Sequence, residues 1–150
     1  GIRESKAIDV KELCITPGEL AWSVMIDLMS INDEGNLLDA ANVAAIAALR
    51  DAKFPTVVDG KIDYLKKTDK SIPLKETPIG VSVLKIGPHL LVDPLIEEED
   101  EADARMTIAT KSDGNLCALQ KGGSAPLTSE EIDQMVGIAQ EKGEELRKCL

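Results

Sequence analysis

The chain has 150 residues, the length of one typical domain or of one domain with part of another. Apolar residues make up 43% of it and charged residues 29%, which favours a folded core over disorder. The net charge of −10 excludes strong binding of RNA or DNA by this chain alone, and the aromatic share of 2% excludes a surface of stacked rings for bases or sugars.

The sequence also indicates a compartment. No apolar stretch is long enough to cross a membrane, and no basic leader precedes one at the start, so we expect a cytoplasmic protein. The three cysteines, Cys14, Cys117 and Cys149, form no C-x-x-C pair. We therefore expect buried, reduced thiols, no metal site and no cofactor. The first residue is Gly1 rather than methionine, so we expect a partial or processed chain.

The first third of the chain predicts two strands and a helix. Pro17-Gly18 favours a turn between a short strand at 14–15 and a long strand at 20–31, which is apolar on both faces. A loop at 32–36 leads into 37–49, where six alanines and the surrounding apolar residues predict a helix covered on nearly all sides. These elements are too few to cover one another, so we expect further sequence or another chain to complete them.

Beyond a boundary near Phe54-Pro55 and a polar, lysine-rich stretch at 59–70, the pattern changes to short apolar runs separated by turns. They predict four strands in two hairpins, at 79–86, 90–93, 105–110 and 116–120. An acidic connector with seven carboxylates, Asp93 to Asp103, joins the two hairpins.

The last predicted element is an amphipathic helix. Thr128 and Glu131 form a capping box, and Leu127 and Ile132 are spaced as a hydrophobic staple. Apolar residues then recur at intervals of three and four. Gly143 lies on this apolar stripe, which predicts close approach of the helix to a sheet. These elements together predict an α+β fold.

Four features could carry chemistry on their own. The acidic cluster at 97–103 could bind Mg²⁺ or Ca²⁺, but it lacks the spacing of an EF-hand, and a solvated connector is the favoured interpretation. His89 is interpreted as a turn residue, and Gly122-Gly123 as a flexible approach to the last helix. The helix start at Gly35-Asn36 has the geometry of an anion site, but Asp39 in its first turn would repel phosphate.

Four segments together resemble the RNase PH superfamily and, within it, the non-catalytic RNase PH-like ring subunit of the archaeal exosome; they are Arg3–Asp9, Gly35–Asn42, Asp93–Leu95 and Thr128–Ile132. The likeness covers essentially the whole chain, but that subunit is longer, and the absent part corresponds to its amino-terminal half. The resemblance implies an α+β, RNase PH-like fold. In it, residues 1–55 end a first domain, and residues 56–150 form a second domain of two hairpins, the acidic connector and the terminal helix.

The resemblance also identifies where active members hold phosphate. They use a Gly-Ser-Arg-type sequence at a helix start, in which the hydroxyl and the guanidinium bind the attacking anion. Here Gly35 matches, but Asn36 takes the place of the serine and Leu37 that of the arginine. An isobutyl group cannot pair with phosphate, so this half of an active site is expected to be lost.

The second half of the active site departs from the pattern as well. The catalytic aspartate of active members lies in an Ala-Asp-Met-Pro-Ile-Ala-type segment, which resembles residues 104–109 with Arg105 in place of the carboxylate. Asp103, two residues earlier, would share a strand face with Arg105 and is the one alternative carboxylate. The resemblance therefore implies a chain with no catalytic residues.

The implied role is one of assembly. The family's subunit alternates with a catalytic sister subunit in a heterohexameric ring, below RNA-binding cap proteins, and helps to guide RNA for 3′-to-5′ phosphorolysis. Arg3 lies where the family carries an RNA-contacting arginine, although it could instead pair with Glu4 or face solvent. Two other functions stay open: a phosphorolytic exoribonuclease active by itself, and an acidic divalent-cation-binding module.

Overall fold

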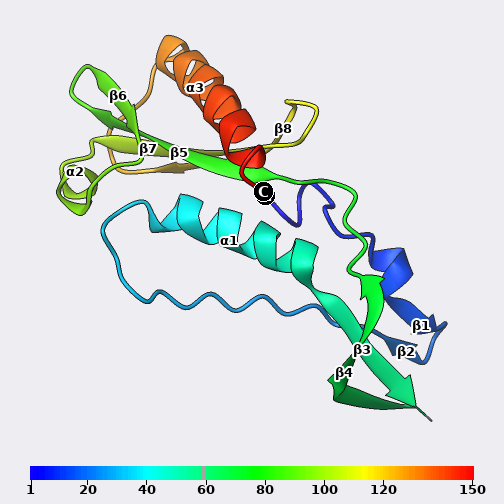
Figure 1. Cartoon of the computed structure of the whole chain (residues 1–150). Coiled ribbons are helices and arrows are strands. Elements are labelled where there is room, and N and C mark those ends of the chain that lie inside the picture. Colours follow the sequence, from blue (N-terminus) through cyan, green and yellow to red (C-terminus); the bar gives the residue numbers. More distant parts are fainter. Residues whose placement is uncertain (59) are drawn as a thin grey trace.

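The computed structural model describes residues 1–58 and 60–150 and shows a four-stranded sheet with helices packed against it and two small two-stranded hairpins at the far end of the molecule (Figure 1). Its elements in chain order are a 3₁₀ helix η1 (Val10–Leu13), β1 (Cys14–Thr16), β2 (Leu20–Ala21), α1 (Leu37–Asp51), β3 (Lys53–Val58), β4 (Lys61–Ser71), β5 (Ile79–Ile86), β6 (His89–Val92), α2 (Ile96–Asp100), β7 (Ala104–Thr110), β8 (Leu116–Gly122) and α3 (Ser129–Arg147).

The main sheet has the order β6-β5-β7-β8 with all neighbours antiparallel. It therefore consists of the two predicted hairpins, β5–β6 and β7–β8, joined through β5 and β7. Gly87 and Gly114 in the hairpin turns have positive φ angles of 55° and 80°, which glycine adopts without strain. The α+β fold with a terminal helix is confirmed.

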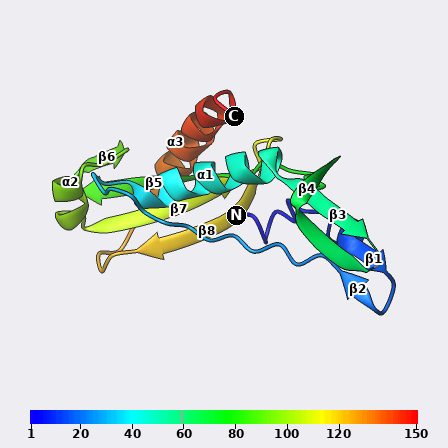
Figure 2. The ribbon, with the colours of Figure 1, turned by 60° about the horizontal axis from the view of Figure 1, so that its bottom comes forward.

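The core lies between this sheet and α3, which crosses one face of it (Figures 1 and 2). Alternate residues of β5 and β7 point toward the helix, as the two-residue period of a strand requires. The buried cluster comprises Ile79, Val81, Val83, Met106, Ile108, Met135 and Ala139. Gly143 packs so closely that a Cβ there would lie 2.9 Å from Oγ1 of Thr110, and the predicted close approach is thus observed.

The predicted capping box at the start of α3 is observed. The backbone N–H of Glu131 donates to Oγ1 of Thr128 at 3.2 Å, and the N–H of Thr128 donates to Oε2 of Glu131 at 2.9 Å. At the other end, Arg147 donates to the carbonyl oxygens of Thr77 and Thr110 at 3.2 and 2.9 Å. Both ends of the helix are therefore fixed, one by its cap and the other by hydrogen bonds to the sheet.

Helix α1 lies beside β5 and completes its edge. Strand β6 pairs only with residues 83–86, so the N–H groups of Gly80 and Ser82 on that edge face no strand. Instead, Gly80 donates to Oδ1 of Asn42 at 2.7 Å, and Ser82 donates to both carboxylate oxygens of Asp39 at 2.8 and 2.9 Å. Two side chains of the helix thus replace a strand as hydrogen-bond acceptors.

The long strand expected at 20–31 is not formed. Strand β2 ends at Ala21, and the chain then runs to α1 without regular structure, as the thread below α1 in Figure 1 shows. Met29 and Ile31 are 89% and 96% exposed, so the expectation of burial on both faces is wrong for this segment. The described residues contain no further strand beside it, and a strand needs such a partner for its backbone groups.

Other expectations also need correction. Helix α1 buries Asp39, Ala45, Ile46 and Leu49, but Leu37 and Leu38 in its first turn are exposed, so it is covered on one side only. Of the lysine-rich stretch at 59–70, for which no strand was predicted, residues 61–70 belong to β4, which pairs with β3, and residue 59 lies outside the described part of the chain. Cys14 and Cys149 are exposed, so the thiols are not all buried. No described helix is long and apolar enough to span a membrane.

Candidate functional site

The start of α1 is occupied by the chain's own carboxylates. The N–H of Gly35 donates to Oδ1 of Asp33 at 3.0 Å, and the N–H of Asn36 donates to Oε1 of Glu99 at 2.9 Å. The Asn36 amide also donates to Oδ1 of Asp93 at 3.0 Å. Free N–H groups at a helix start attract anions. Here the anions are carboxylates of the preceding loop and of the acidic connector.

This arrangement depends on Gly35, which has a φ of +100°. A Cβ at this position would overlap the carbonyl oxygen of Pro94 and lie 2.9 Å from the carbonyl carbon of Leu95. The glycine thus allows the helix start and the connector to meet backbone to backbone. A phosphate here would have to displace Glu99 and approach three further carboxylates, with no cation in the first turn.

Asp39, expected to repel phosphate, is buried and holds the edge of β5. Burial raises the pKa of its carboxyl above the usual range, while the hydrogen bonds from Ser82 and Asn36 oppose that rise and the nearby Asp93 adds to it. Its role is therefore structural as well as electrostatic.

Arg105 lies on β7, between Leu84 on β5 and Gly122 on β8. A Cβ at Gly122 would lie 3.2 Å from Nη2 of Arg105, so the glycine makes room for the guanidinium. Nε of Arg105 is buried and has no hydrogen-bond partner in the described part of the chain. A cavity of about 170 Å³ is lined by both Arg105 and Glu99, so the carboxylate that accepts from the Asn36 N–H and the arginine at the catalytic-aspartate position line the same cavity.

Asp103 does not compensate for the lost carboxylate. Its Oδ2 accepts a hydrogen bond of 2.7 Å from the N–H of Gly87, in the turn between β5 and β6. It precedes β7 and does not line the cavity that Arg105 shares with Glu99. The alternative that Asp103 serves as the catalytic carboxylate therefore has no support in this geometry.

The remaining candidates are placed at the surface. His89 is exposed at the start of β6, as expected for a turn residue. A Cβ at Gly123 would lie 2.7 Å from the carbonyl oxygen of Asp103, so the backbone at this exposed glycine lies close to that of Asp103 and Ala104. Among residues 1–58 and 60–150, no three or more His, Cys, Asp or Glu side chains are arranged to hold a metal ion.

Arg3 lies exposed in a basic groove of about 700 Å³. Lys6, Lys11 and Lys75 line the same groove, and among the described residues Arg3 forms no ion pair with Glu4. The one acidic residue of the lining, Asp9, pairs with Lys75, whose hydrogen bond lowers the pKa of that carboxyl. Arg3, Lys6 and Lys11 thus remain available to bind an anion in this groove, whose other lining residues are mostly apolar.

The sequence did not identify these lysines as part of the site. Lys6 and Lys11 are near Arg3 in the chain, but Lys75 arrives through an antiparallel bridge between Ile8 and Leu74. The N–H of Lys75 also donates to the carbonyl oxygen of Ala7 at 2.8 Å. This long-range pairing leaves no local signal in the sequence.

Comparison with known proteins matches both parts of the chain. Residues 2–55 match the RNase PH model of the 3′ exoribonuclease family, domain 1. Residues 76–142 match the carboxy-terminal RNase PH model of the same family, domain 2. The exosome complex component Rrp42 of Methanosarcina acetivorans is 44% identical over 147 residues, covering 98% of this chain and 53% of that protein. The corresponding protein of Pyrococcus furiosus is 38% identical over 154 residues, covering 100% of this chain and 55% of that protein.

Solved structures give the same result. A chain of an archaeal exosome core superposes with a TM-score of 0.87 at 37% identity, covering 98% of this chain and 57% of that one. A chain of the Archaeoglobus fulgidus exosome with RNA bound to the active site superposes with a TM-score of 0.85, also at 37% identity, covering 98% and 56%. The chain spans just over half the length of the relatives it matches. It belongs to the RNase PH-like 3′ exoribonuclease family, within the Rrp42 group of archaeal exosome components.

Proposed function

We propose that the chain is part of a non-catalytic subunit of an RNA-degrading exosome ring, where it shapes the active site of a catalytic RNase PH-like sister subunit and helps guide RNA for 3′-to-5′ phosphorolysis. One observation carries the first half of this proposal. Glu99 fills the helix start where active members hold phosphate, and it lines a cavity with Arg105, where they have a carboxylate. The chain therefore has no free site for the attacking phosphate at the start of α1 and no catalytic carboxylate at position 105.

The domain organisation is part of the proposal. Residues 1–55 form the end of a first RNase PH-like domain, and residues 56–150 contain the second. The family matches at 2–55 and 76–142 support this division. The exposed apolar side chains at 25–31 support it as well, because the longer relatives have further sequence that could cover them.

The RNA-guiding role falls to Arg3. It lies in the groove with Lys6 and Lys11, and these cations can neutralise phosphates although the chain as a whole is acidic. The solved relative with RNA bound to the active site supports RNA as the ligand of the assembled ring. The proposed partners are the catalytic sister subunit, RNA-binding cap proteins and RNA. The location is cytoplasmic, in keeping with three free thiols.

Reconstitution tests the proposal. The chain and an archaeal catalytic RNase PH-like subunit are prepared separately and mixed, and mass and phosphate-dependent shortening of poly(A) are measured. We expect no shortening by the chain alone, and a larger particle with activity after mixing. Turnover by the isolated chain that disappears in Asp103→Ala would show instead that it is an enzyme by itself.

A cation-binding function is tested separately by calorimetry with Mg²⁺ and Ca²⁺. The acidic connector gives no cluster of metal ligands among the described residues, and Glu98 and Glu99 already accept backbone hydrogen bonds. We expect no binding heat at millimolar metal. A saturable heat that is lost when Glu98 and Glu99 are replaced by glutamine would favour the alternative.

A further inference from the structure

The β3–β4 hairpin links the regions matched by the two domain models. The two matched regions end at 55 and begin at 76, so almost the whole hairpin lies outside both. Figure 1 shows it at the opposite end of the molecule from the main sheet.

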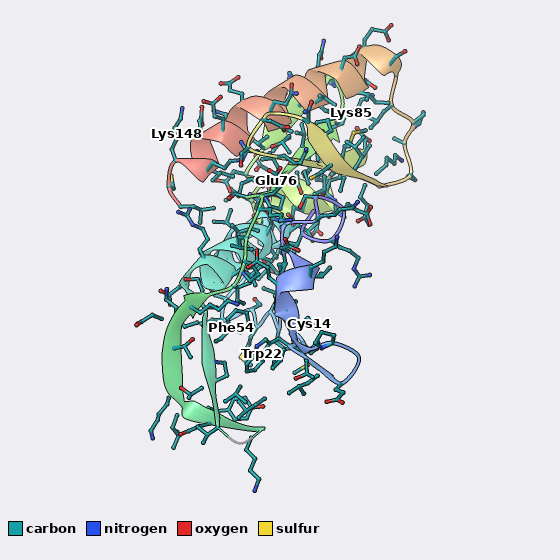
Figure 3. All side chains as sticks on the ribbon, turned by 90° about the vertical axis from the view of Figure 1, so that its right-hand side faces the viewer. Cys14, Trp22, Phe54, Glu76, Lys85 and Lys148 are labelled. Atoms are coloured by element: carbon teal, nitrogen blue, oxygen red, sulfur yellow. The ribbon has the colours of Figure 1, made fainter. Side chains whose placement is uncertain are left out.

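The base of the hairpin is anchored to the rest of the chain. Phe54 is buried, and its ring centroid lies 5.3 Å from that of Trp22, the only tryptophan (Figure 3). Thr68 donates its hydroxyl to the carbonyl oxygen of Phe54 at 2.9 Å, and Nζ of Lys70 lies 5.5 Å from the centre of the Phe54 ring. An isolated two-stranded hairpin is marginal in water, and these contacts hold it in place.

The outer part of the hairpin presents an unusual set of side chains. Pro55 pairs with Lys67, but the next residue of β3, Thr56, pairs with Asp63, so residues 64–66 face no residue of β3. Such an irregularity redirects side chains away from the sheet. Tyr64 is 75% exposed and Leu65 is 95% exposed. The only tyrosine of the chain is thus presented to solvent.

The charge of the hairpin is opposite to that of the chain. Residues 53–71 contain five lysines and three aspartates, a net charge of +2 in a chain of −10. Lys66 and Lys67 follow the exposed tyrosine by two and three residues and are exposed themselves. The pair between Lys66 and Asp63 spans 3.8 Å at the surface, where an ion pair is weak and easily exchanged for another anion.

The hairpin is also continuous with the groove of Arg3. Strand β4 ends at Ser71, and the next residues pair with 7–9 near the N-terminus, which brings Lys75 into the groove. Lys66 and Lys67 are therefore joined to the groove by one short stretch of chain. Nine residues separate Lys66 from Lys75, a span of at most about 30 Å on an extended chain.

We propose that the β3–β4 hairpin is a second contact for single-stranded RNA, in which Tyr64 stacks on a base while Lys66 and Lys67 neutralise phosphates. The inference rests on the proposed RNA-guiding function and extends it beyond Arg3. An exposed ring among cations is how proteins bind single strands without sequence preference. A protein partner is disfavoured because lysine is depleted at the centres of protein interfaces.

The test uses the full-length protein in its assembled ring and a fluorescently labelled oligo(A), with anisotropy measured over a range of salt concentrations. We expect Tyr64→Ala to weaken binding about tenfold and Tyr64→Phe to keep it, since phenylalanine keeps the stacking ring. The double variant Lys66→Gln/Lys67→Gln should lower the slope of log K against log salt by about 1.4, about 0.7 for each phosphate contact.

Lys148→Gln is the matched control, because Lys148 is an exposed lysine with one weak ion pair, on α3 and far from the hairpin (Figure 3). Fluorescence of Trp22 reports whether the hairpin base is intact in each variant. Hairpin variants that bind like the control, while Arg3→Ala binds more weakly, overturn the inference and leave the proposed function standing. Loss of ring assembly in the hairpin variants would identify a protein contact and also overturn it. No RNA binding by the unmodified ring contradicts the proposed function itself.

Discussion

Two glycines of α3 offer a direct test of how closely the helix packs on the sheet. Glycine within a helix costs about 1 kcal/mol relative to alanine, so an unhindered Gly→Ala change should stabilise the protein by about that amount. Gly137 has no atom within 4 Å of an added Cβ, whereas at Gly143 the Cβ would lie 2.9 Å from Oγ1 of Thr110. The same substitution on the same helix should therefore have opposite effects.

The size of the effect at Gly143 follows from its surroundings. Thr110 is buried, and its hydroxyl and carbonyl oxygens both accept hydrogen bonds from Arg147, so it cannot move without disturbing the end of α3. Overpacking of a filled core costs about 1–3 kcal/mol. The better helix propensity of alanine offsets about 1 kcal/mol of that cost. We expect Gly143→Ala to lower the free energy of unfolding by about 1 kcal/mol and Gly137→Ala to raise it by about as much.

Urea unfolding followed by circular dichroism measures both variants against the parent chain. A double variant with Thr110→Ala should recover part of the loss at Gly143, because it removes the obstructing oxygen. If Gly143→Ala proved as stable as Gly137→Ala, the close approach of α3 to β7 would be refuted.

Three further predictions concern the candidate sites. Burial holds the pKa of Asp39 above its value in the unfolded chain, so the native state binds the proton more tightly. The free energy of unfolding, measured relative to Asp39→Asn, should therefore rise as the pH falls through the native pKa. The full gain should be present below the pKa of the unfolded chain. Urea unfolding of both proteins between neutral and acidic pH measures this difference, and a difference that shrinks as the pH falls would contradict it. Leu37→Arg should give no phosphate-dependent shortening of poly(A), because Glu99 still fills the helix start and the opposite half still lacks its carboxylate; detectable shortening would disprove the assignment. Arg3→Ala in the assembled ring should weaken RNA retention and lower the salt slope by about 0.7, and an unchanged slope would show that Arg3 contacts no phosphate.

The second half of the fold was predictable because its signals are local. The strand at 79–86 was expected with the bounds that the structure shows, and the capping box marked the start of α3. Turn residues and alternation specify such elements within a few positions. The segment at 22–31 has the alternation of a buried strand, but a strand also needs partners, and none lies beside it among the described residues. Pattern alone could not reveal that.

The candidate site was predictable only in part. Leu37 and Arg105 were recognised as departures from a catalytic pattern because they fall within short motifs. The carboxylates that fill the helix start were not, since Glu99 and Asp93 lie 63 and 57 residues from Asn36 in sequence. The hairpin β3–β4 was missed because its longer strand, β4, is polar and lysine-rich and lacks the apolar alternation by which strands are recognised.

The way α1 completes β5 has a consequence for solubility. An open strand edge presents free N–H and C=O groups to which the edge of another molecule can add, and this is a common route to aggregation. Along residues 79–82 the acceptors on α1 already engage the N–H groups, and the bulk of the helix blocks approach from that side. Asp39 and Asn42 therefore protect the sheet against unwanted polymerisation, a task that constrains these two positions independently of any RNA chemistry.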